Sequence, residues 1–323
     1  SVTAVRARSS PVRATEKRVP RTLVDALGVR ISKRRAPPLL AGTEVSTLPR
    51  RSSSTDCASP ARPRRRIALT NLRLCFPHWT EAERVALARR NFVYFTQAFL
   101  DRSWLWHGDP AVVRQRLRIT GAVDDLTREG AVVMFAPHFY GMDAGGSAVM
   151  QQIDRPACTI YSTQPNAALA EWMQRGRQRF GDATLLSRTE GVKPIVRALR
   201  EGKMLYLLPD MDLGPHESVF VPFYGVPAAT LTSLPRFARL GRARVVPLTT
   251  RMTPTGYVAE LTPAWADFPT EDVEADTARM NRELESAILT MPGQYYWVHK
   301  RFKSRPEGEP SVYQLYWLLA LME

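Results

Sequence analysis

The chain has 323 residues, 44% of them hydrophobic, and a formal net charge of +14 at pH 7. This length and composition predict a mostly globular protein with one large domain or two small ones. Residues 1–66 contain 16 Lys or Arg and 4 acidic residues, so they carry +12 and the remaining 257 residues only +2. A strongly basic globular body is therefore excluded, and a basic tail on a neutral domain fits either an anionic membrane surface or RNA.

The segment 1–63 is rich in Arg, Ser and Pro and has no long apolar periodicity, which predicts disorder. Within it, one short amphipathic helix is expected over residues 21–31. Three widely spaced cysteines, with no C-x-x-C pair, favour neither a disulfide framework nor a zinc site. No run of 18 apolar residues occurs, so we expect any membrane contact of the given chain to be peripheral.

Ordered structure is expected from about Arg64, which gives a predicted domain over residues 64–323. Thr80 and Glu83 have the spacing of a capping box, so a helix should run from about Glu81 to His107. Short apolar strands and helical stretches then alternate, which predicts an α/β fold with a mostly parallel central sheet flanked by helices. The expected strands are 131–136, 157–161, 203–208, 243–250 and 257–261, and the expected helices are 166–180, 192–201, 230–240 and 271–291.

His138 follows a predicted buried strand, and Asp143 lies five residues later. Five residues on a helix would point the two side chains about 140° apart, so they can meet only if the backbone turns near Gly141. A carboxylate bonded to one imidazole nitrogen would make the other a general base for a hydroxyl nucleophile. Chance also produces this spacing, since His78 and Glu83 share it in a structural context, so a catalytic and an accidental pair remain about equally supported.

Asp210 and Asp212 follow another buried strand, at the edge where ligands gather in open α/β sheets. Their D-x-D-x-G pattern resembles the start of a calcium loop, but its twelfth position is Val221 where a bidentate Glu is required, so we predict no metal. A polar turn without function remains the alternative.

Two groups of cations could bind anionic groups. Arg177 belongs to three alternating arginines at the end of a predicted helix, where they could equally be a solvated helix end. Residues 299–305 place Arg301 and Lys303 among cationic side chains that follow three aromatic residues, and this cluster could bind phosphate or carboxylate head groups. The aromatics are not interleaved with the cations, so it is a weaker platform for nucleic acid, and we expect no nucleic-acid partner.

Over residues 64–313 these stretches together resemble the lipid A lauroyl and myristoyl acyltransferases, within the lysophospholipid acyltransferase superfamily. His138 and Asp143 match the H-x4-D/E motif of the family, and Gly176-Arg177 matches its glycine-arginine pair. Three further blocks resemble the family in register: 64–77 at the start, 209–230 with its P-D-x-D-x-G and F-V-P-F-Y-G patterns, and 296–308 at the C-terminal end. The chain differs in two features: residues 1–63 lack the usual apolar anchor, and Ser162 follows Tyr161 where Arg is frequent.

The resemblance implies a glycerolipid-acyltransferase-like fold and an acyl carrier protein thioester as donor. It also implies an acceptor hydroxyl on a primary acyl chain of a Kdo-bearing lipid A precursor, at the cytoplasmic face of the bacterial inner membrane, and no cofactor. His138 would be the general base, oriented by Asp143, while Arg177, Asp210, Asp212, Arg301 and Lys303 would bind substrate or support the site. The alternatives are an acyltransferase for a glycerophospholipid or phosphoinositide mannoside, a catalytically silent membrane lipid-binding protein, and RNA binding by the basic tail.

Overall fold

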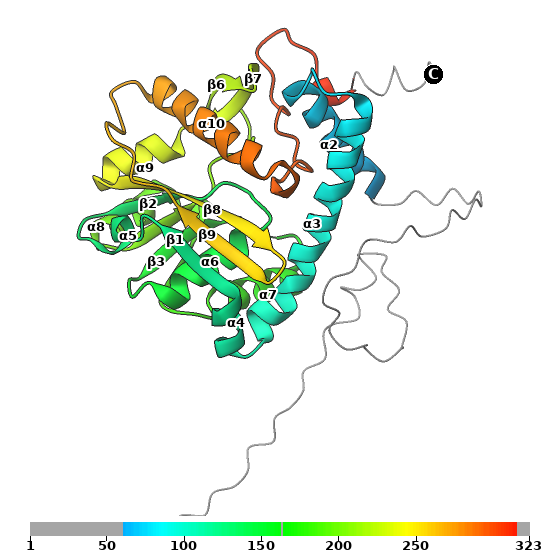
Figure 1. Ribbon diagram of the computed structural model, residues 1–323. Coiled ribbons are helices and arrows are strands. Elements are labelled where there is room, and N and C mark those ends of the chain that lie inside the picture. Colours follow the sequence, from blue (N-terminus) through cyan, green and yellow to red (C-terminus); the bar gives the residue numbers. More distant parts are fainter. Residues whose placement is uncertain (1–60, 163, 315–323) are drawn as a thin grey trace, which may run out of the picture. The chain divides into compact units, whose positions relative to one another are not determined.

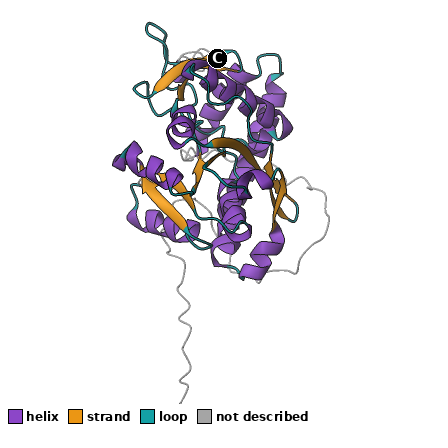
Figure 2. Ribbon diagram, turned by 90° about the vertical axis from the view of Figure 1, so that its left-hand side faces the viewer, coloured by secondary structure: helices purple, strands orange, loops and turns teal. Residues whose placement is uncertain are grey.

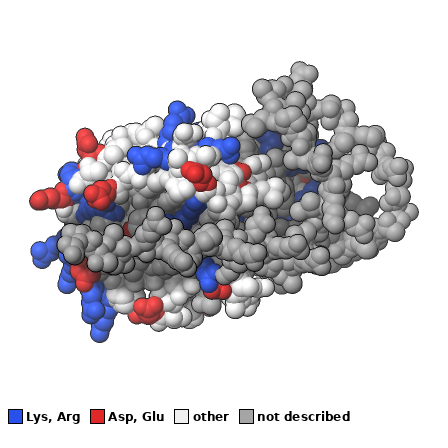
Figure 3. Space-filling view, turned by 90° about the horizontal axis from the view of Figure 1, so that it is seen from below, with Lys and Arg blue, Asp and Glu red and all other residues white. Residues whose placement is uncertain are grey.

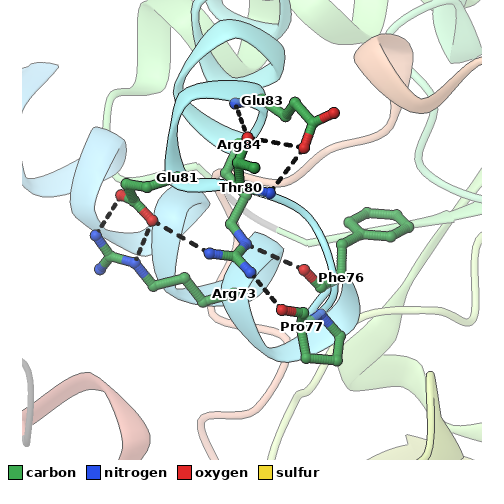
Figure 4. A network of polar contacts seen from close by, with 7 residues as sticks. All are labelled: Arg73, Phe76, Pro77, Thr80, Glu81, Glu83 and Arg84. Carbon is green, nitrogen blue, oxygen red and sulfur yellow. Dashed lines mark hydrogen bonds and ion pairs between the residues drawn. The ribbon is translucent and has the colours of Figure 1, made fainter.

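The computed structural model describes residues 61–162 and 164–314, so the expectations for the basic segment 1–60 lie outside the described residues. The described part opens with two helices, α2 (Ala61–Cys75) and α3 (Glu81–His107). The predicted capping box is confirmed: the Glu83 amide donates to Thr80 Oγ1 at 3.3 Å, and the Thr80 amide donates to Glu83 Oε2 at 2.7 Å (Figure 4). Arg84 donates to the carbonyls of Phe76 and Pro77 in the connecting turn, which fixes how the chain enters α3.

The predicted α/β architecture is confirmed by a seven-stranded sheet in the order β1-β9-β8-β2-β5-β3-β4 (Figure 1). Among its described strands, β8 and β9 pair antiparallel and the other neighbouring pairs are parallel. Strands β6 and β7 form a separate antiparallel hairpin packed beside α10. The strands are β1 (Leu117–Gly121), β2 (Val132–Phe135), β3 (Ala157–Tyr161), β4 (Ala183–Ser187), β5 (Met204–Leu207), β6 (Ser218–Phe223), β7 (Val226–Leu231), β8 (Arg244–Thr253) and β9 (Gly256–Leu261).

Helices cover both faces of the sheet (Figure 2). Along β2, Val133 and Phe135 belong to the core that includes Ile195 of α8 and Phe237 of α9, whereas the alternate residues Val132 and Met134 belong to the core under α6. This alternation follows from the two-residue period of a strand, and burial on both faces explains why the strand reads as a continuous apolar run. The remaining helices are α4 (Pro110–Arg116), α5 (Asp124–Thr127), α6 (Met142–Gln152), α7 (Ala167–Arg177), α8 (Val192–Arg200), α9 (Ser233–Gly241) and α10 (Val273–Thr290), with 3₁₀ turns η1 (Arg188–Glu190) and η2 (Pro292–Gln294).

The expected elements correspond to structural ones with one correction. Thr230 and Leu231 were expected to start a helix but end strand β7, and the helix begins at Ser233. The hairpin pairing of Leu231 with Ser218 and of Thr230 with Val219 extends the strand that far. Local helical periodicity gives no sign of this pairing, since the partner strand lies a dozen residues earlier.

None of the described helices is both long and apolar enough to cross a membrane. Basic and acidic side chains lie next to each other on the part of the described surface that Figure 3 exposes. This mixture agrees with the near-neutral charge of the chain beyond residue 66.

Candidate active site

His138 and Asp210 are brought together by the register of two adjacent parallel strands. Phe135 at the end of β2 pairs with Leu207 at the end of β5. Each of the two polar residues follows its paired strand residue by three positions, so both emerge at the same carboxyl edge of the sheet. The edge at which ligands are expected in an open α/β sheet therefore carries an imidazole beside a carboxylate.

The contact between these side chains is short and shielded from water. His138 Nδ1 lies 2.7 Å from Asp210 Oδ1, and the backbone amide of His138 donates to both carboxylate oxygens at 3.1 and 3.2 Å. The Asp210 side chain is only 1% exposed. Burial raises the pKa of the Asp210 carboxyl, but the charge of His138 and the hydrogen bonds from its ring and amide outweigh burial and keep that pKa below its ordinary value.

The ionised carboxylate determines the tautomer of the histidine. Because a carboxylate only accepts hydrogen bonds, the 2.7 Å contact assigns the ring proton to Nδ1 of His138. The lone pair then lies on Nε2, the nitrogen on the far side of the ring. In this arrangement Nε2 is able to accept a proton while the ring keeps its orientation.

A C-terminal segment supports this pair. The carbonyl of His138 accepts from the Tyr296 amide at 3.0 Å, and the Tyr140 amide donates to the Gln294 carbonyl at 2.9 Å. The Tyr295 hydroxyl donates to Asp210 Oδ2 at 3.1 Å from a fully buried position. The sequence offers no reason to select Tyr295 from the three adjacent aromatic residues.

The prediction that Asp143 orients His138 requires correction. Asp143 lies in the first turn of α6, where its Oδ2 accepts from Arg102 at 2.7 and 2.9 Å and its Oδ1 accepts from Arg177 Nε at 3.0 Å. Burial raises the pKa of the Asp143 carboxyl, yet the charges of Arg177 and Arg102 keep it far below its usual range. Asp143 therefore fixes two guanidinium groups, and Asp210 takes the place expected for it at the imidazole.

Gly176 explains how Arg177 reaches Asp143. A side chain at Gly176 would put its Cβ 2.2 Å from a ring carbon of Trp106, so only glycine lets α7 pack this closely on α3. Arg102, one turn before Trp106 on α3, approaches the same carboxylate from the other helix. Nothing in the sequence pointed to Arg102, because its partner Asp143 is 41 residues away.

A cavity of about 770 Å³ adjoins these residues. His138, Arg102, Asp143 and Arg177 line part of it, and the rest of its wall is largely apolar. The apolar side chains come from α6, α7, α8 and the ends of β3 and β4, and include Met142, Val149, Met150, Ile160, Met173, Leu185 and Ile195. A base next to an apolar chamber suits chemistry on the functional group of a hydrocarbon chain.

Asp212 supports the loop that carries Asp210. Its carboxylate accepts from the amide and hydroxyl of Ser304 at 2.6 and 2.9 Å, and its own amide donates to His299 Nε2 at 3.1 Å. Burial and the nearby charges of His138 and Arg301 lower the pKa of His299 to about 4, so its ring is neutral near pH 7 and accepts this bond. These bonds join the loop to the C-terminal segment next to the His138–Asp210 pair.

Arg301 does not form the expected head-group contact. It is 2% exposed and donates to the Ala229 carbonyl and to Thr230 Oγ1, both at 2.8 Å. Its guanidinium also lies over the ring of Phe223, 4.9 Å from the ring centroid. Arg301 therefore anchors the β6–β7 hairpin. Lys303 is exposed, so it could contact a ligand only at the surface of the protein.

Among the described residues no group of three or more His, Cys, Asp or Glu side chains is placed to hold a metal ion. Of the residues predicted to form one site, His138, Asp143 and Arg177 line the cavity. Asp210 lies behind His138, and Asp212 and Arg301 brace the surrounding segments.

Comparison with known proteins identifies the family of the chain. Residues 55–304 match the family described as bacterial lipid A biosynthesis acyltransferase. The lipid A biosynthesis lauroyltransferase of Escherichia coli is 31% identical over 256 residues, which cover 77% of this chain and 82% of the relative. The lipid A biosynthesis palmitoleoyltransferase of the same organism is 33% identical over 271 residues, which cover 80% of this chain and 86% of the relative.

A Haemophilus influenzae lipid A biosynthesis acyltransferase is 33% identical over 255 residues, with 77% of this chain and 79% of the relative covered. Among solved structures, the 1-acyl-sn-glycerophosphate acyltransferase PlsC of Thermotoga maritima aligns with 70% of this chain and 96% of its own, at 10% identity and a TM-score of 0.34. That structural likeness is too weak to bear on function, so the assignment depends on the sequence relatives. With a family match over residues 55–304 and these relatives, the chain belongs to the bacterial lipid A biosynthesis acyltransferases.

Proposed function

We propose that this acyltransferase moves a fatty acyl group from an acyl carrier protein thioester to the hydroxyl of a primary acyl chain on a Kdo-bearing lipid A precursor. The observation that supports this most is the 2.7 Å contact between His138, on the wall of a largely apolar cavity, and the buried Asp210 behind it. Attack of a hydroxyl on a thioester needs a base and room for hydrocarbon, and no redox step. Family membership supplies the lipid A type of acceptor.

The mechanism follows from the orientation of His138. Nε2 takes the proton of the acceptor hydroxyl as its oxygen attacks the thioester carbonyl, and Asp210 stabilises the imidazolium that forms. The tetrahedral intermediate then collapses, the carbon–sulfur bond breaks, and the imidazolium returns its proton to the departing thiolate. The products are an ester on the acceptor and a free pantetheine thiol, so protons and electrons balance.

Asp143 contributes by holding charge at the wall of the cavity. It neutralises one of the two guanidinium groups that flank it, so Arg102 and Arg177 together leave one positive charge on the wall of the cavity that His138 also lines. A fixed positive charge favours the negative charge that develops on the carbonyl oxygen in the transition state. Arg177, whose side chain is 28% exposed, is the better placed of the two to meet the polar part of a substrate.

We further propose that the reaction takes place at the cytoplasmic face of the bacterial inner membrane, because the acceptor is a membrane lipid and the donor a cytoplasmic carrier protein. The basic segment within residues 1–66 would add electrostatic attraction to anionic lipids. The predicted organisation, a basic N-terminal segment followed by one acyltransferase domain, fits this role.

The test is mass spectrometry of the product after incubation with a tetra-acylated, Kdo-bearing lipid A precursor and acyl carrier proteins of several acyl chain lengths. The expected product has gained one acyl chain as an ester. Parallel incubations with a lysophospholipid and with a phosphoinositide mannoside act as controls. Acylation of either control acceptor in place of the lipid A precursor would overturn the proposal, and so would binding of all three lipids without transfer.

A further inference from the structure

The cavity has a second polar region, away from His138. Three elements form its rim: the turn η1 after β4, the loop between β5 and β6, and the first turn of α9. They contribute Arg188, His216 and Arg236 respectively, together with one acidic residue, Glu217. The loop is joined to the helix because the Thr232 amide donates to the Glu217 carbonyl at 3.3 Å.

The rim is electropositive. Arg188 meets Glu217 through a contact of 3.7 Å between two largely exposed side chains, which is too long for a hydrogen bond and worth little in water. Within the described residues, no hydrogen bond or ion pair engages the guanidinium of Arg236. With two arginines and one carboxylate, the rim keeps a positive charge for a ligand.

The start of α9 adds donors to this rim. Helix α9 has nine residues, and within the described chain its first turn has no acidic residue and its N-cap, Thr232, makes no side-chain capping bond. The amides of Ser233 and Leu234 have no acceptor among the described hydrogen bonds, and Pro235 has no amide proton. An anion near these amides and Arg236 would satisfy donors that the fold leaves unpaired.

The rim is too far from the reacting atoms to be part of the chemistry itself. Arg188 follows β4 and His138 follows β2, and β5 and β3 lie between those strands. Three spacings of roughly 4.8 Å put the two strand ends about 14 Å apart. A group bound beside Arg188 therefore belongs to a remote part of a substrate whose reactive end lies at His138.

We propose that Arg188 and Arg236 form a phosphate subsite at the rim of the cavity. Guanidinium groups suit phosphate because their parallel N–H groups match two phosphate oxygens. The inference rests on the proposed function, in which two substrates carry phosphate: the donor on its phosphopantetheine arm and the acceptor on its sugars. Both sources share the same chemistry, and substrates that differ only in a phosphate separate them.

The experiment compares Arg188→Gln, Arg236→Gln and the double variant with Arg239→Gln. Arg239 lies one turn further along α9, pairs with Glu271 and lies outside the cavity wall, so it is a matched control. Transfer is measured with acyl-phosphopantetheine or acyl-pantetheine as donor, and with acceptors that carry or lack their sugar phosphates. Calorimetry measures binding of phosphopantetheine, of pantetheine and of each acceptor in parallel.

We expect the unmodified chain to prefer the phosphorylated form of one substrate. The double variant should lose roughly tenfold of that preference, through KM rather than kcat, and Arg236→Lys should retain part of it. Loss confined to the donor pair assigns the subsite to the phosphopantetheine arm, and loss confined to the acceptor pair assigns it to the lipid. An unchanged preference in the double variant, or an equal loss in Arg239→Gln, would overturn the proposal.

The binding measurements keep this inference separate from the proposed function. If the chain transfers no acyl group to any acceptor, the proposed function fails. A phosphate-dependent affinity that disappears in the double variant would then still establish the subsite. If transfer proceeds but neither transfer nor affinity depends on phosphate, the subsite fails and the proposed function stands.

Discussion

Asp210→Asn tests the active pair without altering its shape. The carboxylate accepts four contacts, from the His138 ring, twice from the His138 amide, and from the Tyr295 hydroxyl. The asparagine amide has one oxygen, so it can adopt two orientations. With its NH₂ group toward Nδ1 it selects the tautomer that carries the proton on Nε2, which cannot act as a base. With its oxygen toward Nδ1 it keeps the tautomer but loses the charge that stabilises the imidazolium.

The two orientations set the expected magnitude. Losing a positioned proton acceptor costs about 10²- to 10⁴-fold in rate, and the equivalent change in a Ser-His-Asp triad costs about 10⁴-fold through the wrong tautomer. We therefore expect Asp210→Asn to lower the single-turnover rate of acyl transfer by about 10²- to 10⁴-fold, with the apparent affinity for both substrates little changed.

Asp212→Asn is the matched control, since Asp212 lies two residues along the same loop and bonds to Ser304 and Gly214 instead of His138. It should reduce stability and leave the single-turnover rate of the folded protein within about threefold, because about 0.6 kcal/mol, or RT, changes a rate constant by roughly this factor. A near-normal rate in Asp210→Asn, together with a deep loss in Asp143→Asn, would refute the pairing and restore Asp143 as the orienting carboxylate.

Three further outcomes follow from the same contacts. His138→Ala should lower turnover by at least ~10²-fold with the fold intact. The double variant with Asp210→Asn should turn over little more slowly than His138→Ala, because the two residues act as one unit. A further hundredfold loss in the double variant would contradict this pairing. Arg301→Gln should lower the free energy of unfolding, measured in urea, by about 3 kcal/mol, since it breaks a buried charged network. Lys303 is exposed, so Lys303→Gln should change this free energy by less than about 0.5 kcal/mol. Equal effects of the two substitutions would show that Arg301 is not buried as described. The pKa of Asp143 is depressed in the folded protein, so its ion pairs stabilise the fold above the unfolded pKa of about 4, and this stabilisation is lost as the pH falls below that value. Asp143→Asn should therefore be less stable than the unmodified chain at pH 7, and its free energy of unfolding should fall less between pH 6 and pH 2. Parallel pH profiles of the two proteins would argue against the paired carboxylate.

Local patterns in the sequence indicated the helices α3 and α7–α10 and the strands β2, β3, β5, β8 and β9, whereas β1, β4 and the hairpin β6–β7 were not predicted. The capping box at Thr80 marks the start of α3, and continuous apolar runs mark β2, β3 and β5, because these features depend on neighbours along the chain. The end of β7 at Leu231 was missed because its strand character comes from pairing with β6.

Predicting the contact between His138 and Asp210 would have required long-range structural information. His138 and Asp210 each lie two residues beyond their predicted strands, a regularity that was present in the sequence. Using it required knowing that β2 and β5 are neighbours, although two other strands lie between them in the chain. Asp143 was chosen instead because it is close in sequence, but α6 turns its carboxylate toward Arg102 and Arg177. The head-group contact predicted for Arg301 was wrong for a related reason. A run of cationic residues suggests a solvated surface, and only the fold reveals that Arg301 is buried.

The most direct test is the tautomer of His138, read by ¹⁵N NMR of the neutral imidazole. His138→Gln identifies the signal among those of the five histidines. We predict that Nδ1 carries the proton in the unmodified chain and in Asp143→Asn, and that Asp210→Asn shifts population to the form protonated at Nε2. A ring already protonated at Nε2 in the unmodified chain, or one that changes in Asp143→Asn and not in Asp210→Asn, would contradict it.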